Sequence, residues 1–104
     1  MVQLDENSNG QRVNLRAGDL FEIRLAETRT TGFKWTVGEA GEAVCELVEE
    51  SAEAPAGPPG RAGMHRWQFR AARPGEAKIL LHYRRPWEKD AEPGRVFQVQ
   101  IRVT

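Results

Sequence analysis

Apolar and polar residues alternate with a period of two along most of this chain, which is the pattern of β-strands with one buried face. The alternation is clearest between positions 96 and 103, where every second residue is large and apolar: Phe97, Val99, Ile101 and Val103. The residues between them are polar. This segment therefore predicts an antiparallel strand that packs one face on a core and turns the other to water.

Further segments show the same pattern, and turn-forming residues separate them. Those at 21–25, 33–37, 67–71 and 77–83 alternate well, whereas those at 12–16 and 44–49 are weaker. No stretch has convincing helical spacing. We therefore expect an all-β fold, an Ig-like antiparallel β-sandwich of about seven strands. In this fold the weak segment 44–49 lies at an edge and Trp35 is buried.

Two long stretches interrupt the strand pattern. Residues 51–63 are rich in proline and glycine, and the charged stretch within 85–94 ends in Pro93-Gly94, so both are expected to be surface loops. If consecutive strands run in opposite directions, alternate connections share one end of a sandwich. The connections at 28–32, 51–63 and 85–94 then lie together, and short turns make up the other end.

Composition narrows the classes of function. The length of 104 residues suits a single domain, which we expect to span 1–104. The 15 basic residues balance the 15 acidic ones. No overall charge therefore attracts the chain to nucleic acid or to an anionic membrane. No apolar run approaches the ~20 residues of a bilayer span. Cys45 is the single cysteine, so no internal disulfide is possible. Cysteine usage leaves the compartment open, either cytoplasmic or exported with a leader missing from this sequence.

Catalysis, metal binding and RNA binding find little support. Cys45 with His65 or His82 would supply a nucleophile and a base, but Cys45 lies in an apolar strand and is expected to be a core residue. Neither histidine has a carboxylate or thiolate at ligand spacing, so we expect no metal and no other cofactor. A set of arginines could form a basic stripe that binds RNA, but acidic residues lie among them and no aromatic RNA-binding signature accompanies them. A solvated sheet face is the better interpretation. The arginines are Arg61, Arg66, Arg70, Arg73, Arg84 and Arg85.

The loops expected at the shared end carry three short motifs. Thr30-Thr31-Gly32 suits a compact turn, because threonine hydroxyls bond nearby amides and Gly32 can adopt a positive φ. Gly60-Arg61-Ala62-Gly63 lets another surface approach the backbone closely. In Arg85-Pro86-Trp87 the proline directs Trp87 out of the sheet, and tryptophan and arginine are frequent interface hot spots. Each motif alone also fits a bland alternative: an ordinary turn, a flexible loop, or a tryptophan folded over the rim.

Together the three segments resemble the chagasin family of cysteine protease inhibitors. In that family Asn-Pro-Thr-Thr-Gly, Gly-x-Gly-Gly and Arg-Pro-Trp (or Phe) follow in this order on an Ig-like sandwich. The chain retains Thr30-Thr31-Gly32, with Phe33 and Trp35 after it, and the whole of Arg85-Pro86-Trp87. It departs from the family at Thr28-Arg29, which replace Asn-Pro, and at Ala62, which replaces a glycine. The resemblance covers nearly the whole chain, and three motifs in order carry more weight than any one.

The resemblance implies a non-catalytic, reversible, non-covalent inhibitor of papain-like cysteine proteases. Three loops would block the active-site cleft, with Thr31 and Gly32 nearest the catalytic cysteine and Trp87 stacked on the enzyme. A monomer is expected, with no nucleic-acid or membrane partner. The alternative is an Ig-like adhesion or assembly module whose loops bind another protein. The protease contacts implied by the resemblance are Arg29, Thr30, Thr31, Gly32, Phe33, Gly60, Arg61, Ala62, Gly63, Arg85, Pro86 and Trp87.

Overall fold

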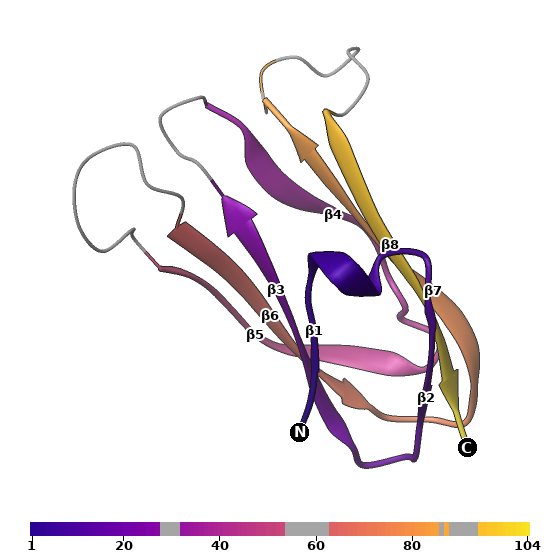
Figure 1. The fold of residues 1–104 in the computed structure, drawn as a ribbon. Helices are drawn as coiled ribbons and strands as arrows, with labels where there is room; N and C mark the ends of the chain where they lie inside the picture. Colours follow the sequence, from indigo (N-terminus) through magenta and orange to yellow (C-terminus); the bar gives the residue numbers. More distant parts are fainter. Residues whose placement is uncertain (28–31, 54–62, 86, 88–93) are drawn as a thin grey trace.

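Two four-stranded sheets pack face to face in the computed structural model, which describes residues 1–27, 32–53, 63–85, 87 and 94–104 (Figure 1). In the first sheet the order is β1 (Val2–Leu4), β3 (Leu20–Glu27), β6 (Gly63–Ala71) and β5 (Cys45–Glu53). In the second sheet the order is β2 (Arg12–Leu15), β8 (Arg95–Val103), β7 (Gly75–Arg84) and β4 (Lys34–Ala40). The short 3-10 helix η1 (Glu6–Ser8) joins β1 to β2 across the sandwich. The predicted β-sandwich is confirmed, with β5 at an edge as expected.

The strand count and the pairing directions differ in detail from the prediction. The described residues hold eight strands rather than about seven, because β1 is only three residues long and buries Leu4 alone, too little for a period to show. Two pairs are parallel, β1 with β3 and β2 with β8. Strand direction still alternates along the chain. The parallel pairs arise because sheet neighbours need not be consecutive in sequence, and these two pairs join strands that run the same way.

The strands β5 and β6 reach further than the sequence pattern predicts. Residues 51–63 are expected to be a loop, yet β5 continues to Glu53 and β6 begins at Gly63. At these ends the inner face carries small or polar residues, with Ala52 opposite His65. The apolar half of the period-two pattern is therefore missing, although the backbone pairing continues.

The edge strands β4 and β5, one from each sheet, are both interrupted. The register of β4 on β7 shifts between Val37 and Glu39, and the register of β5 on β6 shifts between Leu47 and Glu49. Each shift is a β-bulge or similar irregularity, which leaves a residue unpaired and increases the local twist.

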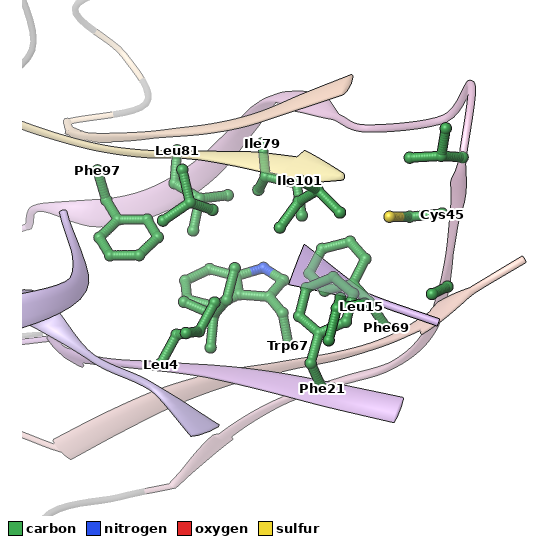
Figure 2. Close-up of a cluster of buried hydrophobic side chains, with 14 of the residues drawn as sticks. Leu4, Leu15, Phe21, Cys45, Trp67, Phe69, Ile79, Leu81, Phe97 and Ile101 are labelled. Carbon is green, nitrogen blue, oxygen red and sulfur yellow. The ribbon is translucent and has the colours of Figure 1, made fainter. Parts of the chain in front are cut away.

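Large apolar side chains from both sheets fill the space between them (Figure 2). The rings of Phe21 and Phe69 stack with their centroids 5.2 Å apart. Burial of a side chain of this size contributes roughly 1.5–3 kcal/mol. Trp35 is 2% exposed, which confirms its predicted place in the core. The largest fully buried side chains include Phe21, Ile23, Leu25, Trp35, Trp67, Phe69, Ile79, Leu81, Phe97 and Ile101.

Cys45 is a core residue, as predicted, and is 3% exposed. Burial raises the pKa of its thiol from 9.0 to about 11, an effect partly opposed by the guanidinium of Arg73. Since only the thiolate is nucleophilic, we expect iodoacetamide at about pH 8 to alkylate native Cys45 about a hundredfold more slowly than the urea-unfolded chain. Mass spectrometry over time measures both rates. Equal rates would contradict the burial of this thiol.

The connections that follow β3, β5 and β7 leave from one end of the sandwich (Figure 1), as the alternation of strand direction predicts. The pairings place Glu27 opposite Gly63 and Lys34 opposite Arg84 at this end. We name it the loop end, defined by the strand ends at 27, 34, 53, 63, 84 and 95. Among the described residues, no helix has the length and apolar character to span a bilayer.

Candidate functional site

The structure describes part of the predicted contact set, namely Gly32, Phe33, Gly63, Arg85 and Trp87. These residues flank all three expected loops, so the strand ends that carry the motifs are visible even where the motifs are incomplete. The remaining predicted contacts lie outside the described residues: Arg29, Thr30, Thr31, Gly60, Arg61, Ala62 and Pro86.

Gly32 and Trp87 bring the first and third motifs into contact. Gly32 has a φ of +79°, the left-handed conformation expected for it. A Cβ atom at this position would lie 2.5 Å from Cη2 of Trp87, so the indole ring lies directly over the glycine. Trp87 is nevertheless 68% exposed. The ring is therefore supported on one side by the first motif while most of its surface faces solvent.

Phe33 and Arg85 form a second contact between the same two segments. The guanidinium carbon of Arg85 lies 4.8 Å from the centroid of the Phe33 ring, a distance suited to a cation–π interaction. Phe33 in turn stacks on Tyr83 at 5.3 Å, and Tyr83 packs on Trp35 at 4.9 Å. This series of rings connects the surface contact to the core.

Gly63 occupies a different environment from the other described contacts. It is the buried first residue of β6 and pairs with Glu27 of β3. The segment was expected to be an irregular loop, so the ladder that begins here is a difference from the prediction.

A polar cluster at the loop end was missed by the sequence pattern. His65 is 2% exposed, with Nδ1 2.9 Å from Oε2 of Glu27 and Nε2 2.7 Å from Oε2 of Glu50. The same Glu27 oxygen accepts the backbone N–H of Trp35 at 2.9 Å. His65 lies two residues before the buried Trp67, and this spacing is the signal that places it on the inner face. Its two carboxylate partners come from other strands, so the lack of carboxylates beside His65 in the sequence did not reveal them.

An open groove of about 700 Å³ lies above this cluster, between the two sheets. Its walls come from both sheets and from the third motif, so it joins the polar cluster to the Gly32–Trp87 contact. Within the part of the chain that the structure describes, no group of three or more His, Cys, Asp or Glu is arranged to hold a metal ion. The residues that line the groove are Glu27, Gly32, Phe33, Lys34, Glu50, Ser51, Ala52, His65 and Trp87.

Three of the arginines considered as a nucleic-acid stripe meet carboxylates of the first sheet. Arg66 Nη2 lies 2.8 Å from Glu22 Oε2, and Arg70 forms an ion pair with Glu46. Arg73 lies 3.7 Å from the other oxygen of Glu46. The pairs with Glu46 are about half exposed, whereas the side chain of Glu22 is buried.

A family model of chagasin family peptidase inhibitors matches residues 14–101. The chain belongs to this chagasin family. Amoebiasin-1 from Entamoeba histolytica is 33% identical over 103 residues, which cover 98% of this chain and 99% of that protein. The crystal structure of the cysteine protease inhibitor EhICP2 from the same organism has a TM-score of 0.90 at 25% identity, covering 99% of this chain and 95% of that one. A structure of PbICP-C in complex with falcipain-2 has a TM-score of 0.66 at 16% identity, covering 100% and 98%, and supports the fold alone.

Membership of the chagasin family confirms the resemblance found in the sequence. The matched range includes the segments of all three motifs. It also confirms that the chain is an inhibitor of peptidases rather than an enzyme. The site residues themselves stay predictions, since the comparisons identify a family and not the atoms that touch a protease.

Proposed function

We propose that this chain inhibits papain-like cysteine proteases reversibly and without a covalent bond, and that the loop end is the surface that blocks the active-site cleft. The observation that carries the proposal is the contact between two family motifs at this end. Trp87 lies on Gly32, and Arg85 lies on Phe33. Large exposed aromatic rings on rigid support are typical of interface hot spots.

The physical basis of tight binding is preorganisation. Trp87 rests on the first motif, and the stacked rings of Phe33, Tyr83 and Trp35 join the site to the core. Side chains held in place before docking lose less entropy on binding. A standard interface buries about 800 Å² on each partner, an area that three neighbouring loops at one end of a small sandwich can supply.

A non-covalent mechanism fits the chemistry of the described residues. The thiol of Cys45 is buried at the start of β5, where its raised pKa keeps it protonated. It pairs with Ala71 at the end of β6 opposite the loop end. The proposed contacts in the loops act through shape, backbone polar groups and the Trp87 ring. The family match favours this function over a general adhesion module.

Titration of papain with the purified protein tests the proposal. Residual activity on a small peptide substrate should fall with inhibitor concentration and return after rapid dilution, because the complex is non-covalent. The mass of the inhibitor should be unchanged after incubation. Full activity of papain and of several cathepsins at about micromolar inhibitor would contradict the proposal and favour an adhesion module. Activity that fails to return on dilution would contradict reversibility.

A further inference from the structure

Three titratable side chains from three different strands meet at the base of the loop end. Glu27 is the last residue of β3, His65 lies near the start of β6, and Glu50 lies near the end of β5. The side chains of His65 and Glu27 are 3% and 6% exposed, whereas that of Glu50 is 42% exposed. We name this group the clamp.

The geometry of the clamp requires a particular proton count. Each ring nitrogen of His65 faces a carboxylate oxygen, at 2.9 Å and 2.7 Å. An ionised carboxylate only accepts hydrogen bonds, and a neutral imidazole offers a single N–H. With both carboxylates ionised, both contacts are hydrogen bonds only when the imidazole is protonated on both nitrogens. Such charge-assisted bonds are about twice as strong as neutral ones.

The clamp joins the strands that carry the first two motifs. Glu27 lies directly before the first motif segment, and its carboxylate also accepts the N–H of Trp35, which lies after that segment. Glu50 and His65 belong to the two strands that flank the second segment. The clamp thus holds the stems of both segments at fixed spacing, beneath the groove that Trp87 also lines.

We propose that Glu27, His65 and Glu50 are positioning residues for protease binding, and that protonation of His65 on both ring nitrogens increases the affinity of the inhibitor for its protease. The inference rests on the proposed function. When the second proton leaves, one of the two carboxylates faces a lone pair, and the stems lose a charge-assisted bond. Affinity is therefore higher while the imidazole carries both protons, and it falls as rising pH removes the second one.

The other groups around His65 do not replace the clamp. From β4, Lys34 lines the same groove and is a further cationic residue there. From β6 itself, Trp67 stacks on the imidazole with ring centroids 4.0 Å apart and carries no charge. The guanidinium of Arg95 from β8 lies over Trp35, 5.8 Å from its ring centroid. The carboxylates of β3 and β5 remain the direct partners of both ring nitrogens.

Glu50→Gln is the decisive variant, because an amide can either accept from an imidazolium or donate to a neutral ring nitrogen. Its clamp is complete in both charge states of His65. The inhibition constant for papain is measured for the wild type and the variant at about pH 5 and about pH 8. The ratio of wild type to variant cancels the protease's own titration. We expect this ratio to rise about five- to tenfold between the two pH values.

A ratio that stays within about twofold while both proteins remain folded overturns the proposal. His82→Gln is the matched control, since it removes the other of the chain's two histidines, whose ring lies against Gly38. It should keep the wild-type pH dependence. Nitrogen NMR of the imidazole gives a second reading: the wild-type affinity should fall over the same pH range in which the His65 ring loses its second proton, and a fall outside that range also overturns the proposal. If the wild type inhibits no papain-like protease at any pH, the proposed function fails and this inference fails with it.

Discussion

Replacing Trp87 by alanine is expected to raise the inhibition constant for papain about thirtyfold or more, the loss typical of an aromatic hot spot. The side chain is 68% exposed, so little of it contributes to the core. The free energy of unfolding should therefore change by less than about 0.5 kcal/mol. Papain titration gives the first quantity, and thermal or urea unfolding gives the second.

Val48→Ala is a matched control for this prediction. Val48 is also an exposed apolar residue, at 53%, but it lies at the irregularity in β5 and not at the loop end. Its replacement should leave inhibition unchanged. If Trp87→Ala and Val48→Ala have the same small effect, Trp87 is not a contact of the protease.

Gly32→Ala is expected to weaken inhibition by a similar factor through a different cause. The backbone φ of +79° disfavours any residue with a Cβ, at a cost of about 1 kcal/mol. In addition, the new methyl group would lie 2.5 Å from Cη2 of Trp87. The ring is at the surface and can move away, so the fold should survive. Trp87 would then lose the support that sets its position, and we expect the inhibition constant to rise about thirtyfold.

Gly10→Ala separates backbone strain from displacement of the tryptophan. Gly10 has a φ of +82°, and a Cβ there would meet nothing within 4 Å. Both variants should lose a similar amount of stability in urea unfolding, whereas only Gly32→Ala should lose inhibition. Unchanged inhibition by Gly32→Ala would show that the contact between the first and third motifs is not needed for binding.

Much of the sandwich follows from the alternation of apolar residues. The strand around Phe97 and Ile101 and the burial of Trp35 are predicted correctly, because side chains of this size have few stable places outside a core. β1 escapes prediction, since three residues define no period. The extended ends of β5 and β6 escape for another reason, since their backbone pairing continues where the inner face is no longer apolar.

The candidate site divides in the same way. The three motif segments follow β3, β5 and β7, and strand direction alternates along the chain, so these segments start at the same end of the sandwich. This placement does not depend on which residues the connections contain. The clamp does not follow from the sequence, because Glu27, Glu50 and His65 come from separate strands and meet only through the register of β3, β6 and β5. The contact of Trp87 with Gly32 joins the β7–β8 connection to the β3–β4 connection, and the alternation of residues along the chain does not predict it.

The irregularities in β4 and β5 bear on how the protein behaves when concentrated. An uninterrupted edge strand offers a row of unsatisfied amides and carbonyls to any similar chain, which is how amyloid-like stacking begins. Here the edge strands β4 and β5 both lose register partway, at Val37–Glu39 and at Leu47–Glu49. Neither strand presents a continuous row of unpaired backbone groups to a second copy. The loop end can therefore stay exposed to a partner while these two edge strands resist strand-to-strand aggregation.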